Sequence, residues 1–248
     1  MSQIKLEELL NSKVYVKENS SVRFTSAKQY VEPFLEALGQ DVKDVRVSVS
    51  SPVMNAEESG KMNIAYPRVN VETTIGGGLE GFTSVVGMIF ALNTQIPIAK
   101  VYTGQSVSVC MNLCIFNSDD LFEKNLLGDF NELYLRTATF KANKMKQIEE
   151  YGKVYKDMTE NMLTPMELNT LMGDLLLKGT TSKLGSSPIV GAAKLLKDNK
   201  TTYYVNEGPD FSCNKWNVLN AVTQVLGDGD PILRPDKTIQ IAKLLEVA

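Results

Sequence analysis

The fold is decided by the stretch NIAYPRVNVETTIGGGLEGFTSVVGMIFALNTQIPIAKVYTGQSVSVCMNLCIF, residues 63–116. Apolar, β-branched and aromatic residues form short runs in it, and glycine-rich or polar breaks separate these runs, which is the pattern of strands joined by turns. Short connections between successive strands favour an antiparallel meander. The predicted strands are 63–75, 82–92, 96–102 and 106–116, with turns at 76–81, 93–95 and 103–105.

The residues that follow this stretch, 119–158, predict one long amphipathic helix that covers a face of the sheet. Ser118 can cap its start, and Asp119 and Asp120 lie in its first turn, where carboxylates favour the positive end of the helix dipole. An apolar stripe at helical spacing should lie on the sheet; it consists of Leu126, Phe130, Leu133, Thr137, Phe140, Ile148, Tyr151 and Tyr155. The predicted class is α+β: an antiparallel β-meander covered by a long helix, with additional C-terminal helices.

Weaker signals place the remaining elements. Thr164-Pro165-Met166-Glu167 is a capping box with proline at the first helical position, and it predicts a helix to about residue 178. GTTSKLGSS, 179–187, predicts an exposed loop. We expect three ranges, 1–62, 63–160 and 161–248, that pack as one unit. The other predicted elements are helices at 4–10, 26–38, 188–198, 215–226 and 235–247, a hairpin at 14–24, and short extended runs at 45–50 and 203–205.

Composition indicates a globular protein of 248 residues, with 43% hydrophobic and 22% charged side chains and a formal charge of −3. We expect a cytoplasmic protein with reduced thiols, because the cysteine count is odd and no signal-peptide pattern or long apolar span occurs. The three cysteines are Cys110, Cys114 and Cys213.

The chain contains no histidine, which removes Ser-His-Asp and Cys-His catalysis and HExxH zinc sites. We therefore expect a protein that is not an enzyme and has no catalytic residues, metal or cofactor. A magnesium-dependent enzyme that uses Asp119, Asp120 or Glu123 is the third functional class considered. GGGLEG at 76–81 lacks the Gly-Lys-Ser/Thr ending of a phosphate loop and is interpreted as a hairpin tip.

A basic segment lies within the predicted long helix. Residues 133–148 contain no Asp or Glu, whereas both flanks are acidic. Such a segment beside an aromatic ring could bind a phosphate backbone, and the alternative is a solvated helical face that lacks acids. Four engaged cations would give a log–log salt slope of roughly −3 for single-stranded nucleic acid. The predicted nucleic-acid-binding residues are Tyr134, Arg136, Lys141, Lys144 and Lys146.

Two motifs carry a family resemblance. KVYTGQSVSVCMNLCIF at 100–116 has a Val-Cys-x-Asn run, and KWNVLNAVTQVLGDGD at 215–230 has a Trp-x-x-x-Asn-Ala-x-Thr run. Together they resemble the phage- and plasmid-like family called domain of unknown function number 932, over about residues 60–230. The resemblance implies a phage or mobile-element context. That family commonly carries His and Arg around its central loop, and this chain has no His, so no activity is carried over.

The expected order of elements is also similar to the β-β-β-α core of phage single-strand annealing proteins. From this analogy we predict a phage-type, non-enzymatic, single-stranded nucleic-acid-binding protein that acts as a homo-oligomer in annealing or recombination of DNA. The alternative is a phage effector or regulatory protein that binds a host protein. Trp216, the only tryptophan, either anchors a terminal helix or contributes to a recognition surface.

Overall fold

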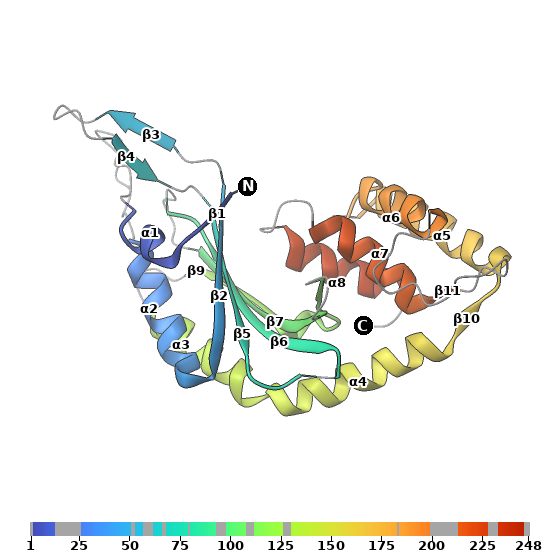
Figure 1. The fold of residues 1–248 in the computed structure, drawn as a ribbon, viewed down its shortest axis with the longest axis horizontal. Coiled ribbons are helices and arrows are strands. Elements are labelled where there is room, and N and C mark those ends of the chain that lie inside the picture. The colour runs from blue at the N-terminus through green and yellow to red at the C-terminus, as the bar shows by residue number, and fades with distance from the viewer. Residues whose placement is uncertain are drawn as a thin grey trace. The chain divides into compact units, whose positions relative to one another are not determined.

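An antiparallel sheet and eight α-helices make up the described part of the chain, which confirms the predicted α+β class (Figure 1). The computed structural model describes residues 2–12, 26–50, 53–56, 62–65, 68–78, 80–92, 98–107, 112–125, 130–182, 184–198, 213–227 and 233–245. None of the helices in these ranges has the length and apolar composition needed to cross a membrane.

The main sheet has the order β1-β2-β5-β6-β7-β8, and β9 also pairs with β7. Every described pairing is antiparallel, so the meander is confirmed. Val47, Val71 and Met88 lie opposite one another on successive strands and form a buried row of the core. The strands are β1 (Ser2–Ile4), β2 (Val42–Val49), β5 (Val69–Ile75), β6 (Phe82–Phe90), β7 (Ile98–Val107), β8 (Leu113–Cys114) and β9 (Leu121–Asn125).

Two further pairs of strands lie outside the main sheet. They are β3 (Val53–Ala56) with β4 (Met62–Ala65), and β10 (Met162–Leu163) with β11 (Cys213–Asn214).

The chain divides into two compact units that are discontinuous in sequence. Unit 1 comprises 1–77, 84–103 and 121–144, and unit 2 comprises 78–83, 104–120 and 145–248. Each unit therefore draws on residues from more than one of the three ranges expected from the sequence.

Unit 1 packs two helices against one face of the sheet. Tyr30 stacks on Phe90 with 4.4 Å between ring centroids, and Phe130 meets Tyr30 edge-on at 5.1 Å. Leu133 and Phe140, both in the predicted apolar stripe, are buried in the same core. The elements of this unit are α1 (Leu6–Leu10), α2 (Ala27–Leu38), the 3₁₀ turn η1 (Gly39–Asp41) and α3 (Asn131–Ala142).

Unit 2 is mainly helical and is centred on the buried helix α7. Trp216 is 4% exposed and packs edge-to-face with Tyr155 and Phe82, so it is a core anchor. Asn112 donates its side-chain amide to Asn220 Oδ1 at 2.7 Å and fixes the start of β8 to this helix. The helices are α4 (Lys144–Glu160), α5 (Pro165–Thr180), α6 (Ser187–Lys197), α7 (Lys215–Gly227) and α8 (Arg234–Leu244).

The prediction of one continuous helix over 119–158 is wrong. Residues 118–120 form the 3₁₀ turn η2 (Ser118–Asp120), and the next five residues form β9, before α3 and α4 begin. Leu121–Asn125 pairs with Ile98–Tyr102, and Glu123 forms an ion pair with Lys100 at 3.0 Å. Pairing with the sheet therefore overrides the local helical pattern of this segment.

The predicted turn at 103–105 is also wrong, because these residues continue β7. Thr103 donates its hydroxyl hydrogen bond to Val85 O at 3.2 Å, and Gln105 pairs with Cys114 of β8. Gly104 is required in this strand because a Cβ there would lie 2.5 Å from the Cys114 carbonyl oxygen. The glycine of Thr-Gly-Gln, which suggested a turn, instead lets the backbones of β7 and β8 approach each other closely.

Several other predicted elements differ from the structure or lie outside the residues that it describes. The predicted helix at 4–10 is strand β1 followed by the short helix α1. Within the strand expected at 106–116, the structure describes Ser106 and Val107 as the end of β7, and Leu113–Cys114 as β8. The hairpin at 14–24, the turn at 93–95, the run at 203–205 and Cys110 lie outside the described residues.

Candidate functional site

The predicted nucleic-acid-binding residues lie on two successive helices. Tyr134, Arg136 and Lys141 belong to α3, and Lys144 and Lys146 belong to α4. Their side chains differ in what they contact.

Arg136 is half-buried and packs against two aromatic rings of unit 1. The carbon at the centre of its guanidinium lies 5.2 Å from the Phe122 ring centroid and 4.7 Å from that of Phe140. A guanidinium over a ring face is attracted by the ring quadrupole and shields the ring from water. Arg136 is thus part of the packing between β9 and α3.

Lys141 caps the carboxyl end of α2. Its ammonium donates a hydrogen bond to Leu38 O at 2.7 Å and lies 3.2 Å from Asp41 Oδ2. The last carbonyls of a helix have no partner within the helix and carry the negative end of its dipole. Lys141 satisfies one of them and joins α3 to α2.

Lys144 contacts the glycine-rich turn between β5 and β6. Its ammonium donates to the Gly76 carbonyl, and its side chain packs beside Gly77, which has φ +88°. Gly81 has φ +78°, so both glycines adopt a conformation that side chains disfavour. The GGGLEG segment is therefore a turn bound by a lysine of unit 1.

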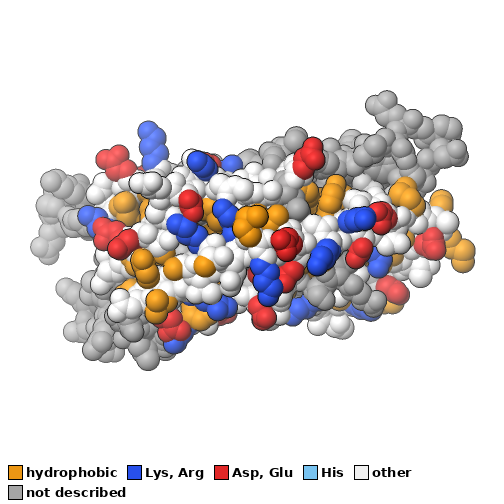
Figure 2. Space-filling model, turned by 90° about the horizontal axis from the view of Figure 1, so that it is seen from below, with side chains coloured by type: hydrophobic (Ala, Val, Ile, Leu, Met, Phe, Trp, Pro, Cys, Tyr) orange, Lys and Arg blue, Asp and Glu red, His pale blue; other side chains and the backbone are white. Residues whose placement is uncertain are grey.

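Lys146 and Tyr134 are the two members of the predicted set that are exposed to solvent. Lys146 makes an i,i+4 ion pair with Glu150 at 3.6 Å, and Tyr134 is 38% exposed. On the face drawn in Figure 2, basic and acidic side chains are interspersed. Three of the four predicted cations thus have specific protein partners within unit 1.

The carboxylates considered for magnesium do not converge on one site. Glu123 is paired with Lys100, whereas Asp120 accepts hydrogen bonds from Tyr151 Oη at 2.7 Å and Gln147 Nε2 at 2.6 Å. Burial raises the pKa of the Asp120 carboxyl above its ordinary value, against the lowering effect of these two donors. Among the described residues, no group of three or more His, Cys, Asp and Glu side chains could hold a metal ion.

The two described cysteines are buried thiols. Cys114 and Cys213 are both in the thiol form, and burial raises the pKa of Cys213 to about 11. Thiols of this kind are packing residues rather than nucleophiles.

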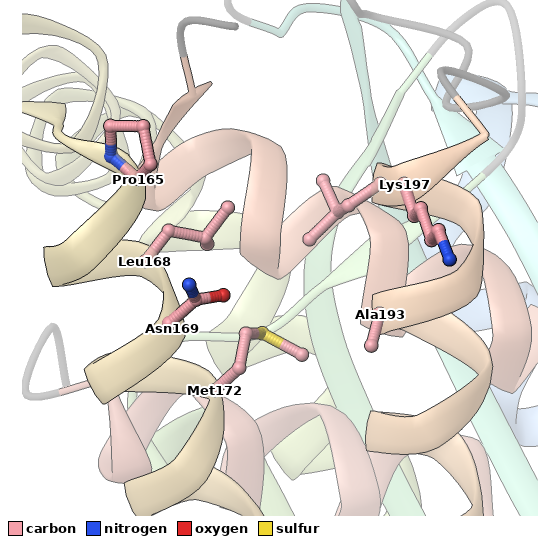
Figure 3. Close-up of a pocket in the computed structure, with 7 residues that line it drawn as sticks. Pro165, Leu168, Asn169, Met172, Ala193 and Lys197 are labelled. Atoms are coloured by element: carbon pink, nitrogen blue, oxygen red, sulfur yellow. The ribbon is translucent and has the colours of Figure 1, made fainter.

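An apolar groove lies between α5 and α6 of unit 2 (Figure 3). Leu168 and Met172 extend from α5 toward α6, and Ala193 lies on the opposite side of the gap. The groove has a volume of about 400 Å³. The described residues that line it are Pro165, Leu168, Asn169, Met172, Ala193, Leu196 and Lys197.

Local sequence signals fix the two helices that form the groove. Thr164 Oγ1 accepts a hydrogen bond from the Glu167 backbone N–H at 3.2 Å, and Thr164 N donates to Glu167 Oε2 at 2.8 Å, as the capping box predicts. At the other end of α5, Gly179 packs directly against Ile189, where a Cβ would collide. The helices therefore approach closely at that end, and the groove is lined by the first half of α5 and the last turns of α6.

Exposed apolar side chains are frequent in the segment of the chain that forms this groove. Nine large hydrophobic side chains among the described residues are exposed, and five of them lie between residues 162 and 190. Exposed large apolar side chains favour interaction, because a partner that covers them removes apolar surface from water. The five are Met162 (54% exposed), Met166 (79%), Leu176 (38%), Leu177 (71%) and Val190 (58%).

The sequence analysis did not identify this groove, although a signal was present. Helix α5 carries apolar residues on more than the single face that packing requires: Leu168 and Leu175 are buried, whereas Met166 and Leu177 are not. A helix that is apolar all round is buried or has a second surface to cover.

Comparison with known proteins returned no match to any family model, curated protein or solved structure. The resemblance to domain of unknown function number 932 therefore stays a prediction.

Proposed function

We propose that this protein is a non-enzymatic binding protein that recognises another protein through the α5/α6 groove. The observation that carries the proposal is the apolar groove itself, formed within a segment, 162–197, that carries five of the nine exposed large hydrophobic side chains among the described residues. If the phage-type context predicted from the sequence holds, a host protein is the partner to seek.

Physical chemistry supports a protein rather than a polar ligand as the partner. Burial of exposed methionine and leucine side chains against another apolar surface lowers the free energy of the system, because it removes them from water. Methionine is flexible and polarisable, so it adapts to partners of different shape. Met172 lines the groove, and Met162 and Met166 are exposed in the same segment of the chain.

The contacts of the predicted nucleic-acid-binding cations favour protein binding over single-stranded nucleic-acid binding. Arg136, Lys141 and Lys144 contribute to the packing of unit 1, and a phosphate backbone would have to compete with those contacts. Nucleic-acid binding by a homo-oligomer stays a prediction, with Lys146 and Tyr134 as the exposed members of the proposed face.

A pair of matched variants tests the proposal. Ala193→Gln places a longer neutral side chain in the groove, and Thr170→Gln makes a comparable change on an exposed face of α5 that does not line it. Both are helix-compatible and exposed, so neither should unfold the protein.

We expect a partner captured from lysate of the source cell to be lost with Ala193→Gln and retained with Thr170→Gln. Equal capture by both variants would contradict the proposal. In parallel, a size measurement with and without a single-stranded oligonucleotide tests the competing hypothesis, because a stable complex with the oligonucleotide would favour nucleic acid as the ligand.

A further inference from the structure

We infer that the occupant of the α5/α6 groove is an amphipathic helix that inserts an apolar ridge between the two helices and places a carboxylate beside Lys197. This inference rests on the proposed protein-binding function and names the chemistry of the partner. It is carried by the form of the groove, by its length and by the charge of its lining.

The form of the groove favours a helical occupant over an extended one. The walls are helices, whose backbone groups are bonded within each helix, so the lining offers no strand edge for an extended peptide to join. The partner must then satisfy its own backbone hydrogen bonds, and a helix does so. Gly179 near the end of α5 contacts Ile189 near the start of α6, so the walls are antiparallel helices. A groove between two helices accepts the side-chain ridge of a third.

The length of the groove sets the length of that ridge. The α5 lining runs from Pro165 to Met172, which is seven residue steps or about 10 Å along a helix axis. A partner ridge at positions i, i+4 and i+7 spans the same distance. Three apolar side chains therefore fill the groove, with Ala193 leaving the space into which they fit.

The charge of the lining specifies a carboxylate. Lys197 is the one charged side chain among the described lining residues, and it is exposed. Helix α6 contains Lys194 and Lys197 and no acidic residue. Glu167, the acid closest to Pro165 along α5, does not line the groove and is held by Thr164. An acidic residue one turn beyond the apolar ridge would lie beside the Lys197 ammonium, where the nearest acid in sequence is Asp198, the C-cap residue of α6.

Two synthetic peptides test this inference by fluorescence anisotropy. Each is an Ala/Gln-based helix of about 16 residues, long enough to form a helix on binding, with Leu at i, i+4 and i+7. One carries Glu one turn beyond the ridge at both ends, so that either orientation brings a carboxylate to Lys197, and the other carries Lys at the same positions. We expect the Glu peptide to bind the wild-type protein about fivefold more tightly than the Lys peptide at low salt.

Three protein variants complete the experiment. Lys197→Glu should reverse the preference between the two peptides, whereas Lys194→Glu, the same change at a lysine that does not line the groove, should preserve it. Ala193→Gln should weaken binding of both peptides at least tenfold.

The outcomes separate this inference from the proposed function. Equal binding of both peptides, with both lost in Ala193→Gln, overturns the carboxylate and leaves the protein-binding groove in place. Absence of binding by either peptide to the wild type, or binding that Ala193→Gln does not weaken, overturns the helical occupant. The proposed function itself falls only if capture of the cellular partner is also unaffected by Ala193→Gln.

Discussion

Lys141 and Lys146 lie five residues apart in one basic segment, and their ammonium groups have different surroundings. Lys141 binds the last carbonyl of α2 and Asp41, whereas Lys146 extends into solvent with an i,i+4 partner. A cation at a helix C-terminus contributes more to stability than an exposed i,i+4 pair. The sequence alone assigns both lysines the same role, because it shows the charge and not the contact.

The first prediction compares these two lysines. Lys141→Met should lower the free energy of unfolding by about 1 kcal/mol, because it removes a charged donor from the end of α2 and keeps most of the apolar stem. Lys146→Met, as the matched control, should change it by less than about 0.5 kcal/mol. Urea denaturation of both variants checks the difference. Equal losses would mean that Lys141 does not cap α2.

The second prediction concerns Asp120, whose burial raises the pKa of its carboxyl above the ordinary value of 3.8. Because the folded state then binds the proton more tightly than the unfolded state, this group's contribution to stability is greatest below pH 3.8 and falls as pH rises through the folded pKa. Asp120→Asn removes the ionisable group and with it this pH-dependent decrease in the free energy of unfolding. The free energy of unfolding of the variant minus that of the wild type should therefore rise with pH between pH 3.8 and the raised pKa of Asp120 in the folded state.

Denaturation of both proteins across that pH range measures the difference. Asp119→Asn, a change of the same kind at an exposed neighbour, is the control for removing a carboxylate from this turn. A difference for Asp120→Asn that falls with pH would show that the hydrogen bonds from Tyr151 and Gln147 outweigh burial.

At the level of elements, the starts of α2 and α5 follow the local sequence, whereas the pairing of β9 with β7 does not. Thr164 and Glu167 form the capping box that their spacing predicts, and Ser26 N donates to Gln29 Oε1 at 2.9 Å at the start of α2. Capping depends on residues three apart, so no distant segment has to be known. Leu121–Asn125 is a strand because β7 lies beside it, and β7 is distant enough that no local pattern reveals the pairing.

The third prediction tests the cap of α5, which forms one wall of the groove. Thr164→Ala should destabilise the protein by about 1 kcal/mol, because the Glu167 N–H loses its acceptor. Thr170→Ala, in the same helix, removes a hydroxyl that bonds only back to Met166 O and should be close to neutral. Thermal unfolding of both variants provides the measurement. A neutral Thr164→Ala would indicate that α5 is held by packing alone.

At the scale of the whole molecule, two compact units have separate buried cores, and neither core corresponds to one continuous range of sequence. The formal charge of −3 is spread over 26 basic and 29 acidic side chains, so total charge favours no class of partner. The basic face of α3 and α4 differs from the α5/α6 groove because most of its charges already have protein partners, whereas the groove is lined largely by apolar side chains.

The fourth prediction concerns the salt dependence of any binding to single-stranded nucleic acid. Four engaged cations predict a log–log slope of roughly −3, whereas Lys146 alone predicts about −0.7. Because the structure gives Arg136, Lys141 and Lys144 other partners, we expect the shallower slope. An oligonucleotide titration by anisotropy at several salt concentrations distinguishes these values. A slope near −3 would mean that those three cations exchange their protein partners for phosphates.

Sequence pattern was enough to predict the fold class, an antiparallel meander, most of the helices and the burial of the apolar stripe residues Leu133, Phe140 and Tyr151. These features depend on periodicity and on contacts between residues a few positions apart. The sequence also identified Trp216 as a possible core anchor, which the aromatic cluster around it confirms.

Which charged and apolar side chains remain available to a partner depends on contacts between segments that are distant in sequence. Lys141 meets Leu38 across 103 positions of sequence, and Lys144 meets Gly76 across 68, so local pattern could not show that these cations were engaged. The groove likewise requires the packing of α5 against α6, which Gly179 and Ile189 set by their close contact. A side chain is available to a partner only if folding brings no other group against it, and these tertiary neighbours cannot be recognised from the local pattern of a single sequence.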